Sequence, residues 1–128
     1  MSAAFRLMHY NQKVGRFGEK LAREYLVKRG YEILNANIKT NYQEIDIVAA
    51  KDKELVFVEV KTRTSCRFGE ADESVFFNKT KNLRRAVGLY LRQADKKTKY
   101  DDIRLDLIAI NIDRTNKNAK IKHYKSIA

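Results

Sequence analysis

The sequence predicts an α/β fold, a β-sheet with helices packed on it, and three patterns lead to this prediction. A broad apolar stripe at helical spacing runs through residues 13–29, as expected for a helix that covers a core. Segments with alternating or β-branched apolar residues, typical of strands, lie at 44–50, 55–61 and 103–112. A second helical pattern lies between the last two of them, and the resulting order favours neither an all-α nor an all-β fold.

The chain begins with residues 1–12, which carry no clear pattern and suit either a flexible segment or an early helical turn. The helix of residues 13–29 should end at Gly30, because glycine readily adopts the left-handed conformation that caps a helix. A short strand is expected at 31–38, before a polar loop at 39–43.

The rest of the chain completes the expected order α-β-β-β-α-β-β. Strands 44–50 and 55–61 should form a hairpin with a four-residue loop between them. The second helical pattern covers residues 72–93, with a break near Asn78. A weaker strand at 119–127 follows the last strong one.

Length and composition exclude several classes of protein. With 128 residues the chain fits one domain, residues 1–128. A single cysteine allows no internal disulfide, which suits a cytoplasmic protein, and two histidines beside it are too few for a tetrahedral zinc site. No apolar run approaches the roughly 18 residues of a membrane span.

Positive charge is the strongest signal in the composition. Lysine and arginine number 27 against 16 acidic residues, which gives a net charge of +11. Such a charge favours a polyanionic partner, nucleic acid and above all DNA, although charge that serves solubility alone is the alternative. A membrane partner is disfavoured, because the apolar stripes are needed for the core.

Two acids and a lysine on the expected hairpin form the candidate site. A four-residue loop sets a register in which Asp46 lies opposite Glu59, and strand alternation puts Lys61 on the same face as Glu59. Two carboxylates about 5 Å apart repel each other. A divalent cation such as Mg²⁺ or Mn²⁺ would relieve the repulsion. The alternative is a hairpin whose exposed charges pair as salt bridges.

This set of residues suits phosphodiester hydrolysis. A metal held by carboxylates can activate water and neutralise charge on a phosphoryl oxygen, and a neighbouring lysine can position the water or stabilise the developing charge. Glu19 lies at the margin of the apolar stripe of the first helix. There it either joins the other carboxylates or remains an ordinary surface glutamate.

Basic residues in the second helical segment are candidates for contact with a phosphate backbone. The set comprises Lys79, Lys81, Arg84 and Arg85, and further basic residues continue to Lys99. Arg63, just past the strand that carries Glu59, is another candidate. The alternative interpretation is a solvated helix face.

Several motifs form a specific set when they are taken together and in order. They are Gly15-Arg16-Phe17-Gly18-Glu19, Glu44-Ile45-Asp46-Ile47-Val48, Val56-Phe57-Val58-Glu59-Val60-Lys61-Thr62-Arg63 and Arg104-Leu105-Asp106-Leu107-Ile108. This set, which extends from about residue 11 to the end of the chain, resembles the YraN family of small bacterial proteins. The resemblance implies a restriction endonuclease-like, PD-(D/E)XK nuclease fold with a central mixed sheet flanked by helices, similar to that of Holliday-junction resolvases.

By this resemblance Asp46, Glu59 and Lys61 would be the catalytic residues. Asp46 and Glu59 would bind the metal, with Glu19 and the backbone carbonyl of Val60 as further ligands. The implied activity is hydrolysis of DNA, branched or single-stranded, with Mg²⁺ or Mn²⁺. The alternative is a non-catalytic nucleic-acid-binding protein that keeps the nuclease fold. Resolvase-like relatives often work as dimers, so the resemblance makes a homodimer a candidate assembly.

Two positions depart from the pattern of the family. Gln43 stands where the family usually has a glycine, a residue that serves a turn or a close approach. Ile45 replaces the proline that precedes the first aspartate of the superfamily motif. Neither change removes a proposed ligand. Elsewhere, Asp106 lies in an apolar strand with Arg104, and a structural ion pair is favoured over a supporting role at the site.

Overall fold

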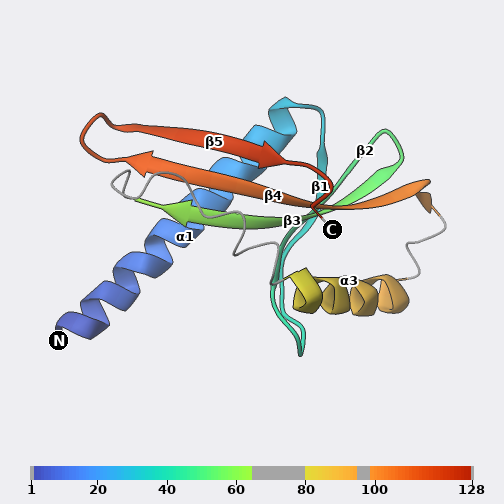
Figure 1. Ribbon diagram of the computed structural model, residues 1–128, viewed down its shortest axis with the longest axis horizontal. Helices are drawn as coiled ribbons and strands as arrows, with labels where there is room; N and C mark the ends of the chain where they lie inside the picture. Colours follow the sequence, from blue (N-terminus) through green and yellow to red (C-terminus); the bar gives the residue numbers. More distant parts are fainter. Residues whose placement is uncertain (1, 65–79, 95–98, 128) are drawn as a thin grey trace.

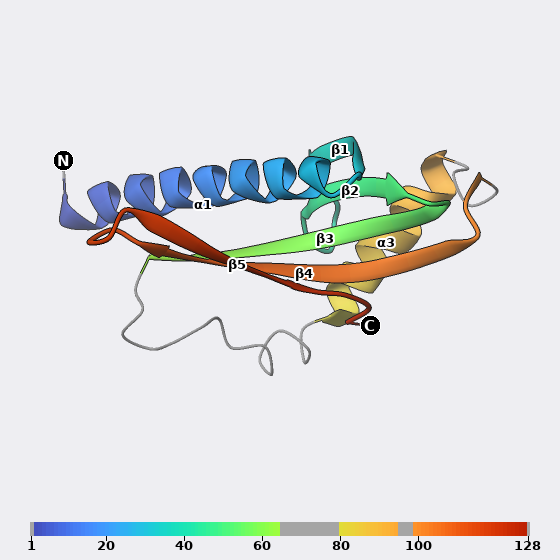
Figure 2. The same cartoon turned by 90° about the horizontal axis from the view of Figure 1, so that it is seen from above.

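A five-stranded mixed sheet forms the centre of the computed structural model, which describes residues 2–64, 80–94 and 99–127. The strands lie in the order of the chain: β1 (Glu32–Ile38), β2 (Ile45–Lys51), β3 (Glu54–Arg63), β4 (Asp102–Asp113) and β5 (Asn118–Tyr124). β3 and β4 are parallel and the other neighbours are antiparallel. Helices α1 (Ala3–Lys28) and α3 (Thr80–Ala94) lie on opposite faces of the sheet (Figures 1 and 2). The expected α/β fold and element order are confirmed.

Helix α1 is longer than the sequence predicts, because it begins at Ala3 rather than at residue 13. Its apolar stripe is buried where it crosses the sheet, for example at Ala22 and Leu26. The helix ends at Lys28, and Gly30, whose φ is 89°, follows it as the expected cap. The backbone N–H of Tyr31 donates to Leu26 and that of Gly30 donates to Val27, both at 3.0 Å, the hydrogen-bond pattern of a Schellman C-cap.

The turn between β2 and β3 has two residues, Asp52 and Lys53, and the expected four-residue loop is therefore wrong. Both turn residues adopt left-handed backbone angles, with φ of 51° and 63°, as a two-residue turn of this type requires. The residues at either end of the expected loop, Lys51 and Glu54, pair with each other. The register of the hairpin is therefore the predicted one.

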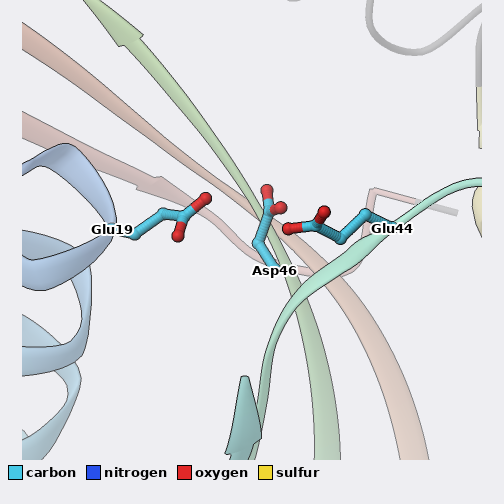
Figure 3. A group of neighbouring side chains, drawn as sticks. All are labelled: Glu19, Glu44 and Asp46. Atoms are coloured by element: carbon cyan, nitrogen blue, oxygen red, sulfur yellow. The ribbon is translucent and has the colours of Figure 1, made fainter. Parts of the chain in front are cut away.

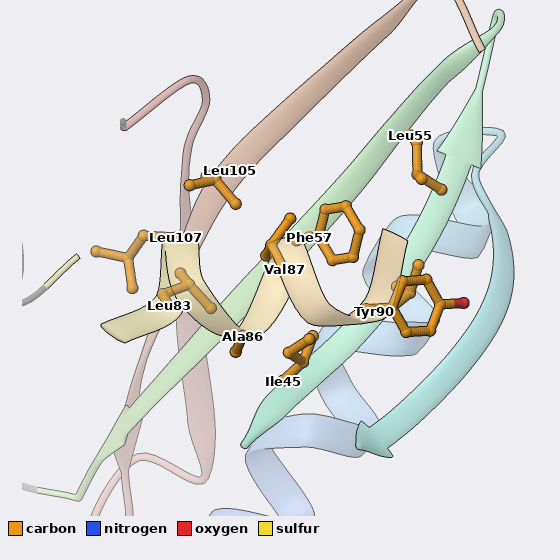
Figure 4. Packing of buried hydrophobic residues seen from close by; sticks show 10 residues of the cluster. Ile45, Leu55, Phe57, Leu83, Ala86, Val87, Tyr90, Leu105 and Leu107 are labelled. Carbon is orange, nitrogen blue, oxygen red and sulfur yellow. The ribbon is translucent and has the colours of Figure 1, made fainter. Parts of the chain in front are cut away.

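Both faces of the sheet are covered by apolar packing. On one face, four residues of α3 pack against the central strands (Figure 4): Leu83, Ala86, Val87 and Tyr90. The rings of Phe57 and Tyr90 meet edge to face, with centroids 5.5 Å apart. On the other face, Leu26 of α1 packs with Val58 and Ile108. Burial on both faces explains the nearly continuous apolar runs of β2 and β4.

A buried ion-pair network centred on Asp106 links β4 to β5 and to the residues that follow β5. Asp106 is fully buried and accepts hydrogen bonds from Arg104 Nε at 2.9 Å and from the backbone N–H of Ser126 at 3.0 Å. His123 Nε2 lies 2.7 Å from the same carboxylate. The favoured structural interpretation of Asp106 agrees with these contacts.

Two further expectations concern the remaining elements. The expected helix of residues 72–93 is described only from Thr80, because residues 72–79 lie outside the described part of the chain. The weaker C-terminal strand ends at Tyr124, not at residue 127. Neither of the two described helices is long and apolar enough to cross a membrane.

Candidate functional site

Asp46 lies where strands β2 and β3 separate. Their paired register ends at Ile47 and Val58, one position before the expected pairing of Asp46 with Glu59. In its place, the Asp46 side chain reaches β3 and accepts a hydrogen bond from the backbone N–H of Val60 at 2.8 Å. The aspartate is only 9% exposed, so its carboxylate is fixed in a nearly buried position at the end of the ladder.

Three carboxylates from separate elements gather at this point (Figure 3). Glu19 reaches it from α1, Asp46 from β2 and Glu44 from the residue before β2. Each offers an oxygen that lies within 4.8 Å of the others. The structure therefore brings Glu19 to the site, and adds Glu44, which the sequence interpretation had not assigned. Glu44 and Asp46 are two residues apart in an extended segment, so strand alternation could have indicated it.

Asn37 of β1 holds two of these acids. With its amide nitrogen directed at the carboxylates, it donates to Glu19 Oε2 at 2.8 Å and to Glu44 Oε1 at 3.0 Å, the orientation that satisfies both groups. Its backbone is left-handed, with φ of 52°, a conformation that asparagine tolerates better than most residues. Nothing in the local sequence pattern indicated this role.

Glu59 and Lys61 lie together on β3, as strand alternation predicts. Lys61 Nζ is 3.5 Å from Glu59 Oε1, and the lysine side chain is 52% exposed whereas that of the glutamate is 13% exposed. Gln43 Nε2 donates to Glu59 Oε2 at 3.2 Å. The glutamine that stands in place of the family's glycine therefore adds a donor to a proposed metal ligand.

The Glu59 side chain starts on the face of the sheet opposite to that of Val58 and Val60. Val58 and Val60 pack in the cluster that α1 covers, whereas Phe57 packs in the cluster that α3 covers, so alternation places the start of the Glu59 side chain on the α3 side. Its charge nevertheless acts on Asp46. The two acids therefore interact electrostatically just beyond the last paired residues of β2 and β3, Ile47 and Val58.

The pKa values of three acids at the site, Glu19, Asp46 and Glu59, are all raised. Burial, followed by the negative charge of Glu59, raises the pKa of Asp46 to about 8, although the hydrogen bond from Val60 opposes the rise. Burial also raises the pKa of Glu59, against the effect of Lys61. Burial and the charge of Glu44 raise the pKa of Glu19. The carboxylates therefore resist being ionised together unless a cation joins them.

The donor set suits a hard divalent cation. All the side-chain groups are carboxylates, and oxygen is the ligand atom that Mg²⁺ and Mn²⁺ prefer. Within the described ranges, no lysine or arginine forms an ion pair with Asp46. The cluster of Glu19, Glu44 and Asp46 can therefore hold a metal ion. The Val60 carbonyl as a further ligand stays a prediction.

The basic candidates lie in two places. Lys81, Arg84 and Arg85 are exposed on α3, on the face of the sheet opposite α1. The Arg85 guanidinium lies 5.6 Å from the centre of the Tyr42 ring, in the loop that leads to Glu44. Arg63 is exposed at the end of β3, and Lys79 lies outside the described residues.

Comparisons with known proteins agree with the motifs. Residues 18–110 match the model of "Uncharacterised protein family UPF0102". A UPF0102 protein of Syntrophomonas wolfei is 42% identical over 113 residues, which cover 88% of this chain and 95% of the relative. One of Caldicellulosiruptor bescii is 44% identical over 114 residues, which cover 89% and 95%.

Proposed function

The chain belongs to the UPF0102 family, which is the YraN family that its motifs resemble. From the geometry of its site we propose that it is a metal-dependent nuclease. The reaction would be hydrolysis of phosphodiester bonds in DNA, branched or single-stranded. One observation carries the proposal: Asp46 is nearly buried among other carboxylates, and its pKa is raised to about 8. Nearly buried acids that are crowded in this way are expected where a cation binds.

Each residue of the site has a role in this proposal. Asp46 and Glu59 would hold Mg²⁺ or Mn²⁺, with Glu19 and the Val60 carbonyl as further ligands, and Glu44 is added to this set because of its distance from Asp46. When bound, such a metal would activate water and neutralise charge on the scissile phosphate. Asp46 is held for this task by the hydrogen bond from the backbone of Val60.

The exposed side chain of Lys61 is available to contact the substrate. Its side chain is 52% exposed, and its ammonium lies 3.5 Å from Glu59 Oε1, so it can turn towards a phosphate without leaving the site. There it would stabilise the charge that develops on the phosphoryl oxygens, or orient the attacking water.

The positive charge supports a polyanionic substrate. Arg63, Lys81, Arg84 and Arg85 would contact the phosphate backbone, and the chain carries a net charge of +11. Because phosphate contacts release counterions, the affinity for DNA should fall steeply as salt rises. A flat response to salt would contradict contacts of this kind.

Cleavage assays test the catalytic part of the proposal. End-labelled linear duplex, single-stranded and four-way-junction DNA are incubated with the protein and Mg²⁺ or Mn²⁺. We expect cleavage by the wild type and by the control Asp52→Asn, which neutralises an exposed aspartate in the β2–β3 turn. Asp46→Asn should be inactive. Equal behaviour of wild type and Asp46→Asn on every substrate would remove the catalytic claim.

Calorimetry with Mn²⁺ separates the nuclease from a non-catalytic binding protein. We expect the wild type to bind Mn²⁺ and Glu59→Gln to bind it much more weakly, since the substitution removes a charged oxygen ligand. Absence of Mn²⁺ binding by the wild type would favour a nucleic-acid-binding protein that keeps the fold without the chemistry.

A further inference from the structure

A groove of about 370 Å³ lies beside the carboxylates, between α1 and the end of β3. Asn11 and Gly15 form part of its wall on α1, and Thr62 and Arg63 form part of its wall on β3. Its lining also includes Glu19, one of the clustered carboxylates, and Val60, whose backbone N–H donates to Asp46. A ligand in the groove would therefore touch the site directly.

Two glycines in the interior of α1 need an explanation, because glycine destabilises a helix relative to alanine. Close packing explains Gly18, since a Cβ there would lie 2.8 Å from Thr62 Cβ. That glycine allows the helix to approach β3 closely. Close packing does not explain Gly15, because a Cβ there would meet nothing within 4 Å. The space left open by Gly15 is not filled by the protein and belongs to the groove.

We propose that this groove seats an unpaired nucleotide of a DNA strand, with Gly15 as the residue that keeps it open. The proposal rests on the proposed function and specifies the form of its substrate. Arg63 would bind a phosphate of the strand, and the amide of Asn11 and the hydroxyl of Thr62 offer donors and acceptors to the nucleotide. The volume falls in the range of about 300–1,000 Å³ that small ligands occupy in protein clefts.

The groove suits an unpaired strand better than a regular duplex. A nucleotide within a duplex is stacked and paired, so it must first be extruded at a cost in free energy before it can enter a recess. A single strand, or the unpaired end of a branched molecule, does not carry this cost. The phosphate that follows the seated nucleotide would then lie near Glu19 and Asp46.

Filling the groove tests the proposal. Gly15→Leu adds a side chain that favours helix and meets no atom at its Cβ, so we expect the variant to fold and its thermal unfolding temperature to be at least that of the wild type. Gly88→Leu is the matched control, because Gly88 is also a helical glycine with nothing within 4 Å of a Cβ, but on α3.

Binding of fluorescein-labelled oligothymidylate is measured by anisotropy in EDTA, which stops metal-dependent cleavage. Because the leucine side chain would occupy the space of the nucleotide, Gly15→Leu should weaken binding about tenfold, which corresponds to about 1.4 kcal/mol, whereas Gly88→Leu should bind like the wild type. Arg63→Gln should also weaken binding, and provides a second test outside the helix. A hairpin duplex should bind the wild type more weakly than the single strand.

Several results would overturn the proposal. Unchanged binding in Gly15→Leu would do so, and so would unchanged binding in Arg63→Gln. Equal losses in Gly15→Leu and Gly88→Leu, or tighter binding of the hairpin, would also overturn it. These outcomes are separate from failure of the proposed function. A wild type that cleaves DNA while Gly15→Leu cleaves and binds equally well would remove only the groove. If the wild type cleaves no DNA but Gly15→Leu still weakens single-strand binding, only the proposed nuclease activity would be contradicted.

Discussion

Replacing Asp46 by asparagine should stabilise the metal-free protein while it abolishes DNA cleavage. Burial and the charge of Glu59 raise the pKa of the Asp46 carboxyl from 3.8 to about 8. Between these two pH values the folded protein holds a proton that the unfolded chain has released. The free energy of unfolding of the wild type therefore falls as pH rises through this window. Asparagine carries no charge, so this loss should be absent from Asp46→Asn.

The size of the effect follows from the shift in pKa. At about 1.36 kcal/mol per pH unit, a shift from 3.8 to about 8 sets an upper limit of about 6 kcal/mol. Water can enter the site and the neighbouring acids can take up protons, so we expect a gain of about 2–3 kcal/mol near pH 8. The asparagine oxygen can still accept the hydrogen bond from Val60 that the aspartate accepts at 2.8 Å.

Urea unfolding in EDTA, from about pH 5 to about pH 9, measures the difference between the two proteins. The gain in Asp46→Asn should grow with pH, and Mg²⁺ should stabilise the wild type but not the variant. Asp106→Asn is the control and should lose about 3–5 kcal/mol, because it leaves Arg104 with a weakened partner in a buried pair. An Asp46→Asn protein that is less stable than the wild type near pH 8, or a difference independent of pH, would refute the reasoning.

Three further changes test other parts of the site. Gly18→Ala should destabilise the protein by about 1–3 kcal/mol in urea unfolding, since its Cβ would lie 2.8 Å from Thr62 Cβ, and Thr62→Ala in the same chain should recover part of the loss. Gly15→Ala should raise the free energy of unfolding by about 0.5–1 kcal/mol, because its Cβ meets nothing within 4 Å; a loss would show that the open space is not real. Asn37→Gly keeps a residue suited to φ of 52° but removes the amide that holds Glu19 and Glu44. Its affinity for Mn²⁺ should fall about tenfold in calorimetry, and an unchanged Kd would contradict the role of the amide.

The sheet could be predicted because its signal is local and repeated. Side chains of a strand alternate with a period of two, and this pattern identified β2 and β3. The register inferred from a four-residue loop is correct although the turn has two residues, because Lys51 and Glu54 shorten the loop equally from both ends and pair with each other. The start of α1 could not be predicted in the same way. Ala3, Arg6 and His9 in its first turns are exposed, and exposed positions of this kind give no apolar period to detect.

Some contacts of the site could be predicted from the sequence, and others depend on how separate elements are placed. Glu59 and Lys61 share a strand, and their contact follows from alternation alone. The contributions of Asn37 and Gln43 depend on how β1 is placed beside β2 and on the loop between them. Asn37 reaches the acids from a residue with φ of 52°, and such a backbone angle is set by tertiary packing rather than by its neighbours in the chain.

The contrast between two aspartates is the strongest physical argument for a cation at the site. Asp106 is fully buried, which by itself would raise its pKa, yet hydrogen bonds from His123 and Arg104 outweigh burial and lower the pKa. Asp46 is 9% exposed and has a backbone hydrogen bond from Val60, but its other neighbours are acids, and its pKa is raised to about 8. The same chain can thus neutralise a buried aspartate when the aspartate serves only the fold. At Asp46 it assembles further negative charge from α1 and from the residue before β2, an arrangement that opposes folding and that a bound metal ion would stabilise.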